Sequence, residues 1–88
     1  MTYTAIRAAC KRAGFPITEQ AQGGRSSLTD CWATSKSHTI QWYEAPGDTD
    51  TRSLYVKRIG AEDDLQSDYW AGSFARTIKN AIRWASAA

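Results

Sequence analysis

Residues 73–86, SFARTIKNAIRWAS, place their apolar side chains at the three- and four-residue spacing of an amphipathic α-helix. The apolar stripe consists of Phe74, Ile78, Ala81, Ile82 and Ala85. The opposite face is polar and basic, so only one side of this helix can be buried. A helix of this kind is stable only against a second layer, which the rest of the chain must provide.

A second helix is predicted over residues 3–13, near the other end of the chain. Its apolar face is formed by Ile6, Ala9, Cys10 and Ala13. Thr2 or Thr4 can accept a hydrogen bond from a free amide of the first turn. Gly14 suits the left-handed conformation that ends many helices, and Pro16 prevents the helix from continuing.

Four segments between these helices have the β-branched and aromatic composition of strands: residues 16–21, 28–34, 39–44 and 54–59. Pro16 favours an edge position for the first segment. The short polar connection SKSH joins the second and third segments into a predicted hairpin. In the fourth segment, either Leu54 and Val56 or Tyr55 and Ile59 can face the core.

Consecutive strands with short connections predict an antiparallel sheet. The order helix, three or four strands, helix therefore predicts an α+β fold, a two-layer sandwich in which an N-terminal and a C-terminal helix flank the sheet. We expect both helices on the same face, which leaves the other face open to solvent or to a partner. The length allows one domain, residues 1–88, in which the stretch QGGRSS is a linker or turn.

No apolar run approaches membrane-spanning length, and the N-terminus lacks the apolar core of a signal peptide. The two cysteines, Cys10 and Cys31, are far apart and form no CxxC motif. These features predict a cytoplasmic protein with reduced thiols, with a Cys10–Cys31 disulfide as the alternative.

The net charge of +2 is too close to balance to identify a nucleic-acid-binding protein. The charge is unevenly distributed, because residues 44–68 carry seven acidic and three basic side chains, whereas both flanking segments are basic. Trp is frequent, with four residues in 88, and such large aromatic side chains serve either in the core or as interface anchors.

The stretch AEDDLQSDYWAG combines a cluster of carboxylates with two large aromatic side chains. The first interpretation is the start of the C-terminal helix, where Asp63, Asp64 and Asp68 would complement the partial positive charge. The second is a recognition loop, in which Tyr69 and Trp70 supply contact area and the carboxylates attract a basic protein surface. The third is a metal site, although the spacing lacks the alternating oxygen donors of a calcium loop.

The residues that could support catalysis are few and scattered. His38 is the only histidine and lies in the predicted hairpin turn, Cys10 should point into the core, and Cys31 lies within a strand. A nucleophile and its base must meet in a cleft, which so small a domain rarely encloses. We therefore expect no catalytic site, no metal site and no cofactor.

A nucleic-acid-binding protein is the alternative, because the two helices carry basic faces that could lie side by side. The residues concerned are Arg7, Lys11, Arg12, Arg76, Lys79 and Arg83. The element order is that of double-stranded-RNA-binding domains, but an acidic stretch stands where their phosphate-binding lysines would be. Binding through the basic faces predicts an affinity that falls steeply with salt.

Several short motifs follow one another along the chain: Phe15-Pro16, Gly23-Gly24, Trp32 or Trp42, and the acidic stretch from Asp64 to Tyr69. In this order they resemble a small domain of phage and mobile-element proteins, the "large polyvalent protein associated" module. The resemblance implies an origin in a phage or mobile element. It names no activity and supplies no catalytic residues.

These observations predict a small non-enzymatic protein that acts by binding a macromolecule. The first hypothesis is a phage-like accessory protein that binds a host protein through Asp63, Asp64, Asp68, Tyr69 and Trp70. Nucleic-acid binding through the basic helix faces is the second. A homodimer formed through the open sheet face or a strand edge is the third.

Overall fold

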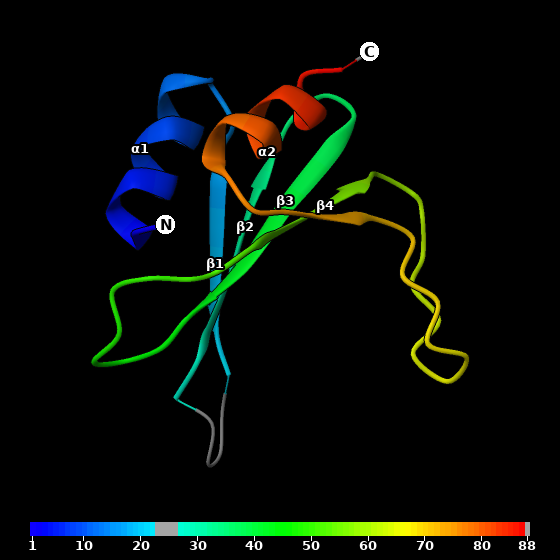
Figure 1. Cartoon of the computed structure of the whole chain (residues 1–88), viewed down its shortest axis with the longest axis horizontal. Helices are drawn as coiled ribbons and strands as arrows, with labels where there is room; N and C mark the ends of the chain where they lie inside the picture. Colours follow the sequence, from blue (N-terminus) through cyan, green and yellow to red (C-terminus); the bar gives the residue numbers. More distant parts are fainter. Residues whose placement is uncertain (23–26, 88) are drawn as a thin grey trace.

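The computed structural model describes residues 1–22 and 27–87. Its elements are α1 (Tyr3–Arg12), β1 (Ile17–Ala21), β2 (Thr29–Thr34), β3 (His38–Glu44), β4 (Leu54–Arg58), β5 (Ser73–Ala75) and α2 (Ile78–Ala85). The strands form one antiparallel sheet in the order β1-β2-β3-β4-β5, and the two helices lie over one of its faces (Figure 1). The predicted α+β sandwich is confirmed, with one strand more than expected. The centre of the predicted QGGRSS linker, including Gly23-Gly24, lies outside the described residues.

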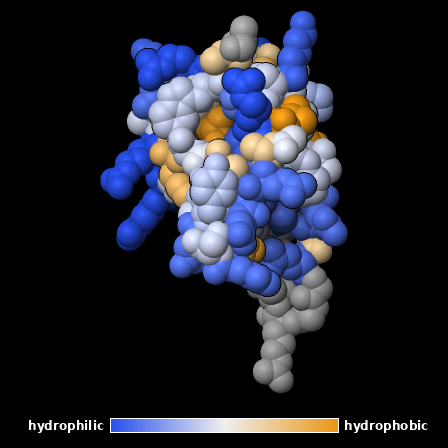
Figure 2. All heavy atoms as spheres, turned by 90° about the vertical axis from the view of Figure 1, so that its right-hand side faces the viewer, coloured by the Kyte–Doolittle hydropathy of each residue, from blue (hydrophilic) through white to orange (hydrophobic). Residues whose placement is uncertain are grey.

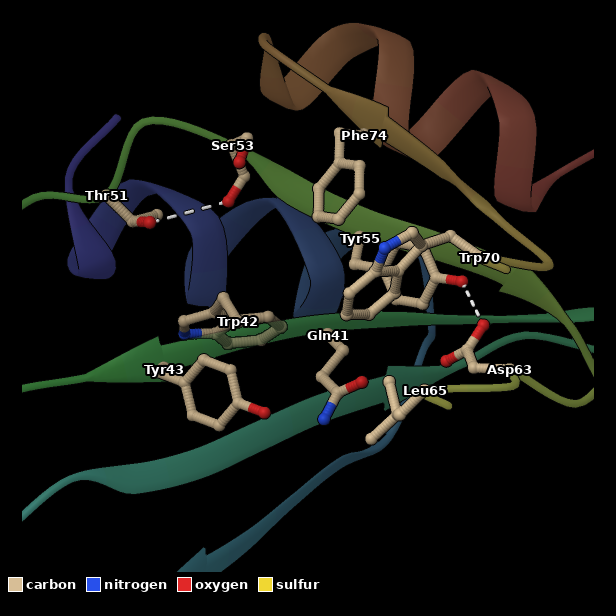
Figure 3. Close-up of a pocket in the computed structure, with 10 residues that line it drawn as sticks. All are labelled: Gln41, Trp42, Tyr43, Thr51, Ser53, Tyr55, Asp63, Leu65, Trp70 and Phe74. Carbon is tan, nitrogen blue, oxygen red and sulfur yellow. Dashed lines mark hydrogen bonds between the residues drawn. The ribbon is translucent and has the colours of Figure 1, made fainter. Parts of the chain in front are cut away.

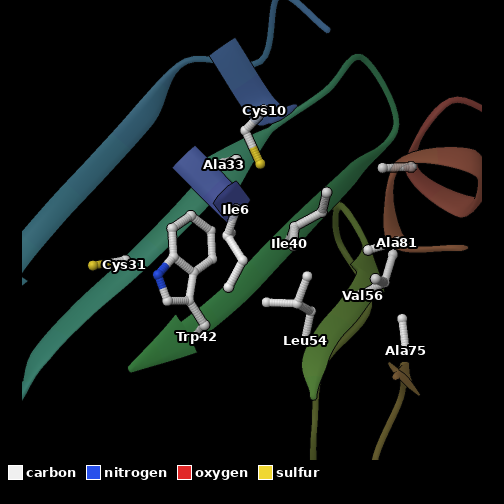
Figure 4. Packing of buried hydrophobic residues seen from close by; sticks show 11 residues of the cluster. Ile6, Cys10, Cys31, Ala33, Ile40, Trp42, Leu54, Val56, Ala75 and Ala81 are labelled. Atoms are coloured by element: carbon white, nitrogen blue, oxygen red, sulfur yellow. The ribbon is translucent and has the colours of Figure 1, made fainter. Parts of the chain in front are cut away.

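The core lies between the helices and the inner face of the sheet. Alternate side chains of β2, β3 and β4 point inward and are buried: Cys31, Ala33, Ile40, Trp42, Leu54 and Val56. Small and aliphatic side chains of both helices cover them, namely Ile6, Cys10, Ala81 and Ala85 (Figure 4). Of the two registers that the sequence leaves open for β4, the structure has Leu54 and Val56 in the core.

The ends of both helices are fixed by local hydrogen bonds. The Thr2 hydroxyl accepts a hydrogen bond from the Ala5 amide at 3.1 Å, which confirms Thr2 as the cap of α1. Gly14 has a φ of +79°, the left-handed conformation expected after α1. Thr77 caps α2 in the same way, since its hydroxyl accepts a hydrogen bond from the Asn80 amide at 3.1 Å.

The C-terminal helix is shorter than predicted, because it begins at Ile78 instead of residue 73. Ser73–Ala75 forms β5, in which Phe74 pairs with Tyr55 of β4. Phe74 is exposed while Ala75 is fully buried, and this alternation is typical of a strand. The acidic stretch therefore leads into a strand, and its interpretation as the start of a helix is wrong.

An ion-pair network joins α1 to the inner face of the sheet. The Arg7 guanidinium donates hydrogen bonds of 2.8 and 2.9 Å to the two carboxylate oxygens of Glu44, and it also pairs with Glu19 of β1. The Trp42 indole N–H donates to the Glu44 carboxylate at 2.9 Å. The hydrogen bonds from Arg7 hold the pKa of Glu44 below its ordinary value, although burial acts in the opposite direction; the Trp42 indole adds to the lowering.

We expect acid to weaken the fold through Glu44. A carboxylate whose pKa is lowered on folding stabilises the protein above its ordinary pKa of about 4.3, and this contribution is lost as the pH falls through the folded pKa. The thermal midpoint of the wild type should therefore fall between about pH 5 and about pH 3. Glu44→Gln should have a lower thermal midpoint than the wild type at neutral pH, and its thermal midpoint should fall less as the pH is lowered. An equally steep decline in both proteins would contradict this account.

Both cysteines are free and buried, Cys10 in α1 and Cys31 in β2. Cys10 belongs to the core cluster, as predicted. Burial raises the pKa of each thiol to about 11, so the reactive thiolate is scarce at neutral pH.

The two thiols should therefore resist alkylation as long as the protein is folded. A rise in pKa from 9.0 to about 11 corresponds to an about 100-fold smaller thiolate fraction. Iodoacetamide labelling, followed by mass spectrometry, should be slower by at least this factor than labelling of glutathione. After denaturation in urea the two rates should converge. Rapid labelling of the native protein would contradict the buried placement of the thiols.

Candidate protein-binding face

The outer face of the sheet, opposite the helices, carries a row of aromatic side chains. The outward positions of β2, β3, β4 and β5 hold Trp32, Tyr43, Tyr55 and Phe74, respectively. Each of them alternates along its strand with a residue that is buried in the core. Within the described chain neither helix covers this face, because both pack on the inner side (Figure 1).

Residues 61–72, here named the acidic loop, project beyond the strands and end in a small hairpin (Figure 1). Asp64 and Tyr69 exchange backbone hydrogen bonds of 2.9 Å in both directions. The Asp64 carboxylate closes the turn, since it accepts hydrogen bonds from the backbone amides two and three residues further along. Asp68 completes the turn with a φ of +57°. The hairpin therefore has a defined shape of its own.

The acidic loop is attached to the sheet through Asp63 and Tyr55. The Tyr55 hydroxyl donates a hydrogen bond to the Asp63 carboxylate and accepts one from the Gly72 amide at 2.7 Å. The same carboxylate accepts a hydrogen bond from the Ala71 amide at 2.8 Å and lies 3.6 Å from the Lys57 Nζ. The hydrogen bonds from Tyr55 and Ala71 lower the pKa of Asp63, so this carboxylate is charged at neutral pH. Both ends of the loop are thus tied to one phenol.

Gly72 allows the acidic loop to pass close to β4. A Cβ atom at this position would lie 2.3 Å from the Val56 carbonyl oxygen and 2.9 Å from the Tyr55 ring. Because these distances are shorter than any ordinary van der Waals contact, the close approach requires a residue without a side chain.

A groove of about 380 Å³ lies between the acidic loop and the outer face (Figure 3). Its lining includes Gln41, Tyr43, Tyr55, Leu65, Trp70 and Phe74. The Trp70 ring lies against two sheet residues, with centroid distances of 5.7 Å to Tyr55 and 5.9 Å to Phe74. The Tyr55 and Phe74 rings are themselves 4.8 Å apart. This mutual packing of the rings holds the groove in shape.

The groove gathers most of the exposed large apolar side chains of the described chain. These side chains are Tyr43, Ile59, Leu65, Tyr69, Trp70 and Phe74. Four of them line the groove, Tyr69 lies beside it in the acidic loop, and within the described residues Ile59 alone lies elsewhere. Figure 2 views the side on which the loop projects, and pale ring side chains lie there among strongly hydrophilic neighbours. Clustered exposed apolar surface on a small domain is typical of an interaction site.

The structure places the five predicted contact residues on one loop and gives them different roles. Asp63 faces Tyr55 and holds the loop on the sheet, and Asp64 closes the hairpin turn. Asp68, Tyr69 and Trp70 are exposed to solvent. Asp64 is exposed as well, so four of the five can meet a partner directly, and only Asp63 is half-buried.

Tyr43, Leu65 and Phe74 line the groove although they are not among the contact residues predicted from the sequence. The strand period could have identified Tyr43, which follows the inward-facing Trp42. Phe74 fits the helical stripe of residues 73–86 equally well, so its outward position depends on the pairing of β5 with β4. Leu65 is separated from the groove residues of β3 by a long stretch of chain, and only the folded loop brings them together.

The six basic residues predicted as a nucleic-acid-binding surface fall into three groups. Arg7 is half-buried, and its charge is paired with Glu19 and Glu44. Arg12 and Lys79, from different helices, line one hollow between α1 and α2. The remaining three, Lys11, Arg76 and Arg83, are exposed. The placement of Arg76 on the C-terminal helix is wrong, because this residue lies between β5 and the start of α2 at Ile78.

His38 lies at the start of β3 instead of within the turn, and it is half-buried with Nδ1 2.6 Å from the Ser37 hydroxyl oxygen. Within residues 1–22 and 27–87, no three His, Cys, Asp or Glu side chains come together in a group that could hold a metal ion. In the same part of the chain, neither helix has the length and apolar composition needed to cross a membrane.

Comparisons of the chain with protein-family models, curated proteins and solved structures find no match. The geometry of the outer face is therefore the basis for assigning a function.

Proposed function

We propose that this protein is a small, non-enzymatic protein-binding module that contacts its partner with the aromatic groove and the acidic loop. The observation that carries the proposal is the clustering of exposed apolar side chains at one uncovered face, where the Trp70 ring packs on Tyr55 and Phe74. Large aromatic side chains in well-packed pockets supply most of the binding energy at protein interfaces. The carboxylates of the loop favour a partner with a basic surface, because complementary potentials steer association.

The anchoring of the acidic loop supports this role. Its two ends are hydrogen-bonded to the Tyr55 hydroxyl, and its hairpin is closed by Asp64. Binding therefore requires little ordering of the loop, and less of the interaction free energy is lost to conformational entropy.

The partner that we propose is a host protein. The resemblance of the chain to a module of phage and mobile-element proteins implies an origin of this kind. A protein with that origin works inside a host cell and meets the proteins of the host there.

Trp70→Ala should weaken partner binding by about 30-fold, or about 2 kcal/mol, because it removes the ring that packs on Tyr55 and Phe74. Leu65→Ser removes a side chain that is 69% exposed and should weaken binding without altering the fold. The experiment is a pull-down of the tagged protein from nuclease-treated bacterial lysate, read by mass spectrometry and followed by titration of the captured protein.

Ile59→Ala is the matched control, since it removes an exposed apolar side chain outside the groove and should bind like the wild type. Urea denaturation of each variant verifies that the fold is intact. If Trp70→Ala and Leu65→Ser capture the same proteins as the wild type, at the same level, the groove is not the binding site and the proposal is wrong.

Nucleic-acid binding is the second candidate, favoured by the shared hollow of Arg12 and Lys79 between the helices. It predicts that affinity for a labelled DNA duplex falls steeply between low and high salt, because phosphate binding releases counterions. Arg12→Glu combined with Lys79→Glu should abolish this binding, whereas Trp70→Ala should leave it unchanged. An affinity that does not depend on salt would exclude this candidate.

A further inference from the structure

We infer that the aromatic groove binds a proline-rich segment of the partner in the polyproline II conformation, with arginine or lysine beside the prolines. This inference rests on the proposed function and specifies the kind of peptide that the groove takes. Aromatic-lined grooves are suited to such segments, because proline rings pack on aromatic faces and the segment is already extended before it binds.

The hydrogen-bond donors of the groove favour polyproline II over a helix. The Trp70 indole N–H and the Tyr43 hydroxyl have no hydrogen-bond partner within the described residues, whereas the Trp42 indole donates to Glu44. A polyproline II segment has no internal hydrogen bonds, so its carbonyl oxygens are free to accept from these donors. A helix satisfies most of its own carbonyl groups and would leave both donors unused.

The course of the groove favours polyproline II over an added β-strand. The lining comes from β3, β4, β5 and the acidic loop, so the groove crosses the outward side chains of three neighbouring strands. Strand addition instead requires the free backbone of an edge strand. At the β1 edge, the inward-facing Glu19 is paired with Arg7, and an inward charge of this kind discourages further strand pairing.

The acidic loop favours a basic residue next to the prolines. Three of its carboxylates, those of Glu62, Asp64 and Asp68, form no ion pair within the described residues. They stand on the same loop as Trp70, which is 50% exposed. An arginine placed there can stack on the indole and pair with a carboxylate at the same time.

Solution NMR tests this inference with a defined probe, an octaproline peptide that carries paired arginines at both ends. The ¹⁵N-labelled wild type should give one indole N–H signal for each of its four Trp residues, and Trp70→Phe identifies the signal of Trp70. Addition of the peptide should shift the Trp70 signal and leave the Trp84 signal in place, because Trp84 belongs to α2 on the opposite face of the sheet and does not line the groove. Leu65→Ser should weaken peptide binding at least tenfold, and Ile59→Ala should not.

Two matched peptides separate the contributions of conformation and charge. Replacing the prolines by a glycine-serine repeat should abolish the shift, and replacing the arginines by glutamates should weaken binding at least tenfold. The inference is wrong if the octaproline peptide leaves the Trp70 signal unchanged, or if the glycine-serine peptide shifts it equally. It is also wrong if light scattering shows a dimer that Trp70→Ala dissociates, because the groove would then bind a second copy of the chain.

The failure of this inference can be distinguished from the failure of the proposed function. If the pull-down captures a protein through the groove while the octaproline peptide has no effect, the module binds another kind of segment. If the pull-down captures nothing that depends on Trp70 and the peptide also fails to bind, both proposals are wrong.

Discussion

Trp42→Ala should lower the free energy of unfolding by about 3–5 kcal/mol, the range for removal of a large aromatic side chain from a core. Trp42 is 2% exposed and belongs to the same core cluster as Ile6 of α1 (Figure 4). A domain of this length is stabilised by about 4–13 kcal/mol in total. The variant should therefore be marginally folded at room temperature, and urea denaturation followed by circular dichroism measures the loss.

Trp42→Phe is the matched control for this substitution. It keeps most of the ring volume but removes the indole N–H that donates to Glu44. Because Arg7 still binds both oxygens of that carboxylate, the expected loss is smaller, about 1–2 kcal/mol. Equal losses in the two variants would contradict the view that packing is the main contribution of Trp42.

Gly72→Ala should lower the free energy of unfolding by up to about 3 kcal/mol, the upper end of the range for overpacked sites. The new Cβ atom would lie 2.3 Å from the Val56 carbonyl oxygen, and backbone within a sheet cannot move aside as a flexible side chain can. We expect β5 and the acidic loop to separate from β4. Hydrogen exchange should show faster exchange of the Gly72–Ala75 amides, and the Trp70-dependent binding should be lost.

Gly47→Ala is the control that separates steric conflict from backbone conformation. Gly47 has a φ of +84°, but a Cβ atom there would meet nothing within 4 Å. Its substitution should cost only the strain of the left-handed conformation, about 1 kcal/mol, and should leave the groove unchanged. If Gly72→Ala were no more destabilising than Gly47→Ala, the close approach of the loop to β4 would not be tight in solution.

The fold could be predicted from the sequence wherever the spacing of apolar residues fitted a helix or a strand, but not both. The stripe containing Ile6 and Cys10 indicates α1, and the alternation around Ile40 and Trp42 indicates β3. β5 was not predictable in this way, because Phe74 stands four residues before Ile78 and fits a helix as well as a strand. Pairing with β4 decides between the two, and that pairing is a tertiary interaction.

The types of residue in the candidate site could be predicted from the sequence, but the contacts between them could not. The concentration of carboxylates beside Tyr69 and Trp70 is visible in the sequence. The sequence does not show that Asp63 anchors the loop, because its partner Tyr55 lies in β4. The Tyr55 hydroxyl also binds the amide of Gly72, which is 17 residues further along the chain. Hydrogen bonds between residues so far apart in the chain leave no local sequence pattern from which they could be predicted.

The order of the strands in the sheet has a consequence for how the chain is assembled during synthesis. Every strand pairs with the one made just before it, so the sheet can grow steadily as the chain leaves the ribosome. Among the described residues the core is completed by α2, which follows all five strands in the chain and supplies Ala81 and Ala85. Before α2 is made, α1 is the one helix of the described chain that can cover the inner face, and a chain interrupted there would expose an apolar surface prone to aggregation.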